Sequence, residues 1–199
     1  MRKYQLAKTS NPTTLPVSLA DAKLHLNIES SETYFDDELT SLIYTARDLV
    51  ERRTHLTLIA TTYTAKWMCF PKCELAIPGY PISAIDSVQY YDTDGTLQTL
   101  ASHQESLSSK PVFISPDVSD DWPDTQDERI DAVQVSFTAG YGATSATVPY
   151  QCAHLIKLLV GHWFKNREAV GTTNGQIELG FTALVNSVQV NEFQEFSSQ

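Results

Sequence analysis

The fold is decided by residues 33–69, which read TYFDDELTSLIYTARDLVERRTHLTLIATTYTAKWMC. In the first part of this stretch, apolar side chains recur every three or four residues, which is the period of an amphipathic helix. From Thr62 to Cys69 apolar and polar side chains alternate instead, which is the period of a half-buried strand. The change of period predicts that a helix ends near residue 54 and that a β element begins at about residue 61.

Helices are predicted near residues 18–27, 33–54 and 149–166. Ser18 is followed three residues later by Asp21, a pattern typical of a capped helix N-terminus. Thr33 has a side chain that can cap the second helix, and the acidic residues after it suit the positive end of the helix dipole. Pro149 fits the first turn of the third helix, where a missing N–H has no cost.

The residues between about 61 and 140 carry the pattern of an antiparallel β element inserted between helices. Strands are predicted at 62–69, 85–91, 96–100, 112–114 and 133–138. Asp92-Thr93-Asp94-Gly95 predicts a hairpin turn, because glycine adopts positive φ without strain. The order of helices and strands predicts the α+β class, with a helical core and a β insertion.

The chain has 199 residues, about the size of one domain, so we expect a single connector domain over residues 1–199. Its expected parts are an N-terminal arm (1–15), a helical core (16–58 and 148–168), a β insertion (60–142) and a C-terminal tail (170–199). We expect the tail to be extended, although its weak apolar pattern leaves open whether it forms helix or strand.

The composition of the chain argues against several classes of function. The formal net charge of −10 argues against a large nucleic-acid footprint, because phosphate binding requires concentrated lysine and arginine. It leaves open a surface that DNA only passes. No apolar run approaches the length of a membrane span, so we expect no membrane partner. The basic N-terminus lacks the apolar stretch of a signal peptide, which favours synthesis in the cytoplasm.

The sequence contains no recognisable catalytic motif, so we expect no enzyme activity, no cofactor and no metal. Cys69 and Cys73 could form half of a zinc site, but structural zinc requires four ligands. The other candidate ligands, Cys152, His154 and His162, belong to a predicted helix far along the chain. A small metal-dependent hydrolase and a host regulatory binding module remain as alternative functions.

Two segments are candidates for interaction. The first is an acidic loop around residues 117–131, with carboxylates at Asp117, Asp120, Asp121, Asp124 and Asp127. It is either a solvated loop or a negative surface that faces a channel or a basic partner. The second is the tail, with apolar side chains at Leu184, Val185, Val188, Phe193 and Phe196. Apolar groups in a polar terminal segment are typical of a docking peptide.

Several stretches, taken together in their order and spacing, resemble the head-tail connector proteins of phages. They are PVSLADAK (16–23), DDELTSLI (36–43), IDSVQYYDTDG (85–95), VSFTAGYG (135–142) and LLVGHWFKNREA (158–169). The chain thus looks like a member of the head-completion, or adaptor, family of long-tailed bacteriophages and related prophages. The resemblance covers roughly residues 16–170, so the acidic loop and the tail fall outside the pattern.

The resemblance implies a structural protein of the virion neck, assembled in the host cytoplasm. It implies a ring of about a dozen copies on the DNA exit channel, which requires a contact whose rotation closes. The implied partners are other copies of the chain, the portal protein, and a stopper or tail-completion protein, with DNA passing through without specific binding. The family's C-terminal segment commonly reaches the portal, which agrees with the docking role expected for Phe193 and Phe196.

Overall fold

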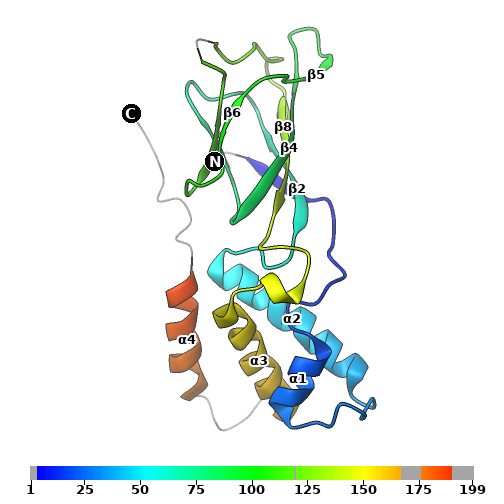
Figure 1. The fold of residues 1–199 in the computed structure, drawn as a ribbon. Coiled ribbons are helices and arrows are strands. Elements are labelled where there is room, and N and C mark those ends of the chain that lie inside the picture. The colour runs from blue at the N-terminus through cyan, green and yellow to red at the C-terminus, as the bar shows by residue number, and fades with distance from the viewer. Residues whose placement is uncertain (1–3, 119, 167–175, 190–199) are drawn as a thin grey trace. The chain divides into compact units, whose positions relative to one another are not determined.

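The computed structural model describes residues 4–118, 120–166 and 176–189, without the side chains of residues 176–179 (Figure 1). The chain forms two compact units. The β unit comprises residues 1–11 and 60–140, and the helical unit comprises residues 12–59 and 141–199. The predicted α+β class with a β element inserted between helices is confirmed. The single connector domain stays a prediction.

The helical unit contains α1 (Leu19–Leu26), α2 (Asp36–Thr54), a 3-10 turn (Ser145–Thr147), α3 (Tyr150–Lys165) and α4 (Gln176–Val188). The start of α1 is as predicted, because the Ser18 hydroxyl accepts a hydrogen bond from the backbone N–H of Asp21. Its end is also as predicted, because Asn27 adopts a left-handed conformation with φ of 57°. No helix of the described ranges is both long enough and apolar enough to cross a membrane.

The start of α2 differs from the prediction. The helix begins at Asp36 after Phe35, and no side chain caps it, so the expected Thr33 cap is wrong. The carboxylate of Glu32 accepts a hydrogen bond from the backbone N–H of Tyr34, and the Thr33 carbonyl accepts one from Asp36. Glu32 thus organises the turn before the helix in place of a threonine hydroxyl.

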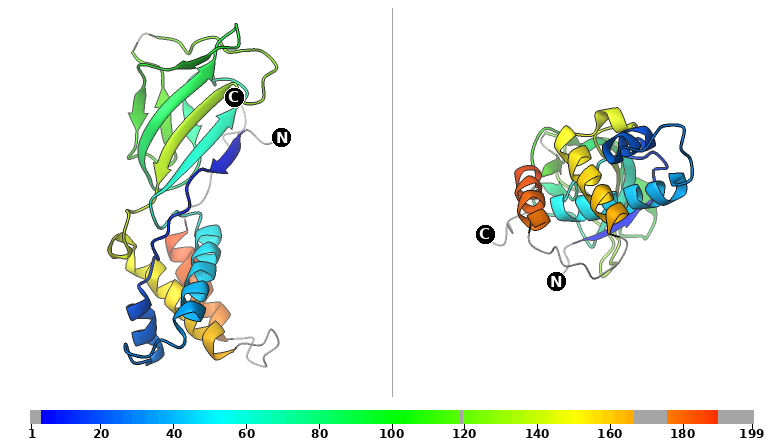
Figure 2. Two further views of the ribbon diagram at one scale, coloured as in Figure 1. Left: turned by 90° about the vertical axis from the view of Figure 1, so that its right-hand side faces the viewer. Right: turned by 90° about the horizontal axis from the view of Figure 1, so that it is seen from below.

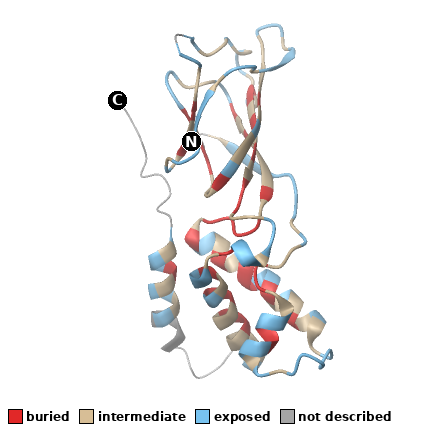
Figure 3. Ribbon diagram, in the orientation of Figure 1, coloured by how far each residue is buried: buried red, intermediate tan, exposed pale blue. Residues whose placement is uncertain are grey.

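The core of the helical unit forms where α2 packs against α3. Its fully buried side chains include Leu39, Ile43, Val50, Leu155 and Ile156 (Figure 3). These positions recur at the helical period in both elements, which is why each helix has one buried face.

The expected extended tail contains a helix. Residues 176–188 form α4, drawn in orange-red in Figure 1, which packs against α2 and α3. The Val185 side chain is only 7% exposed, so this part of the tail is packed against the helical unit. The prediction of an extended tail is therefore wrong for this stretch.

The β unit contains two antiparallel sheets (Figure 2). Their strands are β1 (Gln5–Lys8), β2 (Thr61–Trp67), β3 (Leu75–Ile77), β4 (Ile82–Tyr91), β5 (Leu97–Thr99), β6 (Gln104–Ser106), β7 (Val112–Ser115) and β8 (Val133–Ala139). One sheet has the order β1-β2-β8-β4-β5 and the other the order β3-β7-β6. Apolar side chains from both sheets, among them Ile77, Val88, Ile114 and Phe137, form one buried cluster.

Part of the expected N-terminal arm has regular structure. Part of the expected arm, residues 1–15, is the edge strand β1, in which Leu6 lies opposite Ala65 of β2. Because β2 already pairs with β8 on its other side, β1 completes the hydrogen bonding of a strand edge that would otherwise be open.

Candidate interaction surfaces

The acidic loop connects β7 to β8 in the β unit. The predicted carboxylates at Asp117, Asp120, Asp121, Asp124 and Asp127 are all exposed. The Ser102 hydroxyl donates a 2.5 Å hydrogen bond to the Asp117 carboxylate, and this bond is the main reason why the pKa of Asp117 is lowered. A hydrogen bond from the backbone N–H of Val118 lowers it further. Asp117 is therefore an ionised acid with local partners.

One anchor of the acidic loop is aromatic. The ring of Trp122 stacks on Phe70, with centroids 4.4 Å apart and planes 6° from parallel. Its indole N–H donates a 3.0 Å hydrogen bond to the carbonyl of Cys73. Trp122 was not among the predicted site residues, although a single tryptophan in an acidic run is a signal that the loop packs against the rest of its unit.

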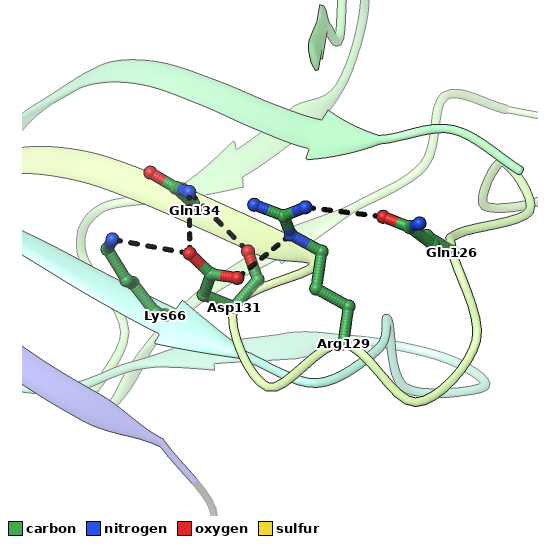
Figure 4. Close-up of polar contacts among 5 residues, drawn as sticks. All are labelled: Lys66, Gln126, Arg129, Asp131 and Gln134. Atoms are coloured by element: carbon green, nitrogen blue, oxygen red, sulfur yellow. Dashed lines mark hydrogen bonds and ion pairs between the residues drawn. The ribbon is translucent and has the colours of Figure 1, made fainter. Parts of the chain in front are cut away.

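A second anchor lies at the end of the loop (Figure 4). The Arg129 guanidinium lies 3.3 Å from the ring centroid of Tyr91, a cation–π contact. Its Nε is 2.9 Å from Asp131 Oδ1, and its Nη1 donates to Gln126 at 3.3 Å. Asp131 is also 3.6 Å from the Lys66 ammonium group. The loop is thus held by Trp122 and Arg129, which leaves its other carboxylates exposed to solvent.

The structure describes three of the five predicted tail residues. Leu184, Val185 and Val188 belong to α4, where Val185 is buried and the other two are half-buried. Phe193 and Phe196 lie outside the described residues. The described tail residues belong to the helical unit, and the acidic-loop residues belong to the β unit.

An open groove of about 640 Å³ runs along the outer side of α2. We call it the acidic groove; its lining residues are Asp37, Thr40, Ser41, Tyr44, Thr45, Asp48, Leu49, Arg52 and Trp163. The Tyr44 hydroxyl donates a 2.8 Å hydrogen bond to the Thr13 carbonyl, which fixes the ring on the groove wall. The helical period of the sequence predicts the buried face of α2 but not this surface on its outer side.

A second groove, of about 570 Å³, lies between α4 and the end of α2. Its walls combine Arg52, Arg53 and His55 with apolar side chains, among them Phe181 and Val185. This α4 groove is basic on one side and apolar on the other, and it ends at Gln189, the last described residue.

A basic face forms on α3 and the end of α1, comprising His25, His154, Lys157 and Lys165. Burial is the main cause that lowers the pKa of His25, and the positive charges of Lys157, His154 and Lys165 lower it further. No ion pair connects Lys157 or Lys165 to an acid within the described ranges.

The thiols and histidines do not assemble into a described metal site. Cys69 and Cys73 are exposed, and no group of three or more potential metal ligands occurs in the part of the chain that the structure describes. Cys152 is buried in α3, and this burial raises the pKa of its thiol to about 11. A thiol in that state is a packing group rather than a nucleophile at neutral pH.

A comparison with protein-family models and with curated proteins finds no match. Among solved structures, a chain from the neck of an empty gene transfer agent (GTA) particle, solved with sixfold symmetry, matches with a TM-score of 0.76 and 18% identity. A chain from the neck of a native GTA particle, solved with twelvefold symmetry, matches with a TM-score of 0.69 and 19% identity. A chain from the virion of a native GTA particle matches with a TM-score of 0.67 and 17% identity.

Each of these matches covers 96% of this chain and 98% of the other. The likeness therefore includes both units and the connections between their elements. At this level of identity it shows that the chain has the same fold as these particle proteins.

Proposed function

We propose that the chain is a structural neck protein of a phage or phage-like particle. In this proposal it forms an oligomeric adaptor ring between the portal and the stopper or tail, and the ring lines the channel through which DNA leaves. The observation that carries the proposal is the nearly complete overlap with a GTA neck chain, over 96% of one chain and 98% of the other at a TM-score of 0.76.

The ring is supported by the symmetry of the particles from which the similar chains come. Two of them belong to necks solved with sixfold and twelvefold symmetry. A cyclic ring of identical subunits requires two different surfaces on each copy, because its contacts are heterologous. The helical unit offers an open groove and a separate basic face, which satisfies that requirement.

The tail is the segment that we assign to the portal. Because Val185 is buried within the helical unit, its side chain is not free to dock. Leu184 and Val188 are half-buried, so Phe193 and Phe196 beyond α4 are the stronger candidates for portal contacts. Two aromatic side chains in a terminal segment provide the kind of anchor that dominates binding energy at interfaces.

We assign the acidic loop to a surface that faces the channel or a basic partner. Its carboxylates at Asp120, Asp121, Asp124 and Asp127 are exposed, so each copy presents them to its surroundings. Repeated around a ring, they produce a negative potential that repels DNA phosphates. Such a surface lets DNA pass without specific binding.

The proposal is tested by deleting the gene from the genome that encodes the particle. We expect DNA-filled heads that fail to join tails, with normal particles restored by the complete chain. A chain truncated after Gln189 keeps α4, and we expect it to fold but not to restore joining. The matched control, Ser197→Ala and Ser198→Ala in the complete chain, is expected to restore it.

Normal particles in the absence of the gene would contradict the neck assignment and favour a host regulatory module. Full complementation by the truncated chain would contradict only the portal-docking role of the tail. Electron microscopy of purified particles distinguishes these results, because it shows heads and tails separately.

A further inference from the structure

The acidic groove and the basic face belong to the same unit but lie on opposite sides of α3. Trp163, which lines the groove, is nine residues after His154, and nine residues advance a helix by about two and a half turns. His154, Lys157 and Lys165 therefore share one side of α3, and Trp163 points to the other. We call the side of the helical unit that carries the acidic groove its acidic flank, and the side that carries the basic face its basic flank.

The basic flank is built around a glycine. A Cβ atom added at Gly161 would lie 3.4 Å from His25 Nε2. Gly161 is four residues after Lys157 and four before Lys165, so the three residues share the side of α3 that meets the end of α1. The close approach of α1 at Gly161 places His25 beside α3, where burial first and the positive charges of Lys157, His154 and Lys165 second lower its pKa.

The acidic groove combines charged and apolar side chains. Trp163, Tyr44 and Leu49 line it together with Asp37 and Asp48. A surface that combines charge with apolar area is typical of a protein interface.

Within the described ranges, neither flank has an ion-pair partner of its own. In that part of the chain, no ion pair includes Asp37 or Asp48, and none includes Lys157 or Lys165. Arg52, at one end of the groove, offsets part of its negative charge, so the attraction is centred on the two aspartates. Opposite charges that lack partners within a subunit are available to a neighbouring subunit.

We propose that the acidic groove of one copy receives the basic face of the next copy, with Asp37 and Asp48 opposite Lys157 and Lys165. This inference rests on the proposed ring, and it specifies the ring's subunit contact. Because the two flanks differ and lie on opposite sides of α3, the contact is heterologous and repeats from copy to copy. An isologous dimer would instead place each flank against itself, which like charges disfavour.

The test uses two charge-reversal variants of the complete chain. The acid-reversed variant carries Asp37→Lys and Asp48→Lys, and the base-reversed variant carries Lys157→Glu and Lys165→Glu. Each variant alone places like charges across every subunit contact. We expect its self-association, measured by sedimentation at low salt and by copies per particle, to be at least about tenfold weaker than that of the wild type.

An equimolar mixture of the two variants gives the sharpest result. In an alternating ring every contact again joins opposite charges, so the mixture is expected to assemble as the wild type does. Control reversals at exposed positions of the β unit outside the acidic loop, Lys8→Glu with Lys72→Glu and Glu74→Lys with Asp94→Lys, are expected to leave subunit association unchanged. Thermal melting establishes that each variant is folded.

A measurement on the wild type does not depend on the folding of variants. Zero-length carbodiimide cross-linking of the assembled chain is expected to join Lys157 or Lys165 of one copy to Asp37 or Asp48 of another, as identified by mass spectrometry. The proposed contact would be overturned if either variant alone assembled as the wild type does, or if the mixture assembled no better than either variant alone. Both results would leave the ring itself intact. A wild-type chain that forms no ring, alone or on particles, would overturn the ring and this contact together.

Discussion

The helical unit and the β unit use charge in different ways. In the described part of the chain, the charged residues with buried side chains are Lys23 and Arg47, both in the helical unit. Lys23 pairs with Asp36 at 2.5 Å, and Arg47 pairs with Glu51 at 3.1 Å. In the β unit, by contrast, the densest group of acids lies on an exposed loop.

This difference shows that net charge alone does not identify a functional surface. The chain has a formal net charge of −10, but Asp36 and Glu51 contribute to it as half-buried partners of the buried cations Lys23 and Arg47. Acids of that kind hold helices in place, whereas acids on the loop are available to the surroundings. The predictions below test this division, from the largest expected effect to the smallest.

The largest effect is expected from Glu51→Ala in the helical unit. Its carboxylate pairs with Arg47 and also accepts a 2.8 Å hydrogen bond from the backbone N–H of Leu58. Removing it leaves a guanidinium that is 3% exposed without its partner, and we expect a loss of about 3 kcal/mol in the free energy of unfolding. Chemical denaturation measures this loss.

The control is the double variant Arg47→Met with Glu51→Leu, which removes both charges and keeps the volume. We expect it to be much closer to the wild type than Glu51→Ala, because apolar replacements of a buried pair are often tolerated. Equal losses for the two variants would mean that the pair contributes through packing rather than charge.

A smaller effect is expected from Trp122→Ala in the β unit. This change removes the stack on Phe70 and the hydrogen bond to the Cys73 carbonyl. Because Trp122 is half-buried, we expect a loss of about 1–3 kcal/mol, together with faster proteolysis of the acidic loop. Trp122→Phe keeps an aromatic ring and is expected to retain most of the stability. An unchanged melting temperature for Trp122→Ala would show that the loop is not attached through this ring.

Neutralising the loop acids is expected to have almost no effect on stability. Asp120, Asp121 and Asp124 are exposed, and none of them forms an ion pair with another described residue. We expect the triple asparagine variant to melt with the wild type, because exposed charges contribute little. A large drop in melting temperature would contradict the difference between the two units, because it would mean that the loop acids stabilise the fold as Glu51 does.

A further small effect is expected for the pH dependence of stability through His25. Burial and nearby positive charges lower the pKa of His25 below 6.5 in the folded protein. Its stabilising contribution is therefore complete above pH 6.5 and decreases as the pH falls toward the lowered pKa, because the unfolded chain binds the proton more readily. We expect His25→Gln to reduce the fall in melting temperature between pH 7 and pH 5. An unchanged pH profile would contradict this role.

The local features of the fold were predictable from the sequence. The Ser18 cap, the end of α1 at Asn27 and the change of period before β2 follow from neighbouring residues alone. The hairpin at Asp92 is another case, because Asp92 accepts backbone hydrogen bonds from Asp94 and Thr96 while Gly95 adopts a φ of 79°. Each of these features is decided within a few residues.

The features that the sequence analysis missed depend on distant partners. Strand β1 exists because β2 has an open edge, and α4 has a buried side because α2 and α3 lie beside it. The short strands β3 and β6 each have three residues, too few to show a period. For the candidate surfaces, the loop carboxylates were recognisable as exposed, but the attachment through Trp122 and the groove along α2 required the positions of residues far apart in the sequence.

The central claim, that copies of this chain form a ring in a particle neck, is tested most directly by a cryo-electron microscopy map of the particle. We predict a ring of density between portal and tail into which this fold fits, with α2 of each copy facing the basic side of α3 in the next. A neck whose density cannot contain this fold, in particles of normal composition, would contradict the account.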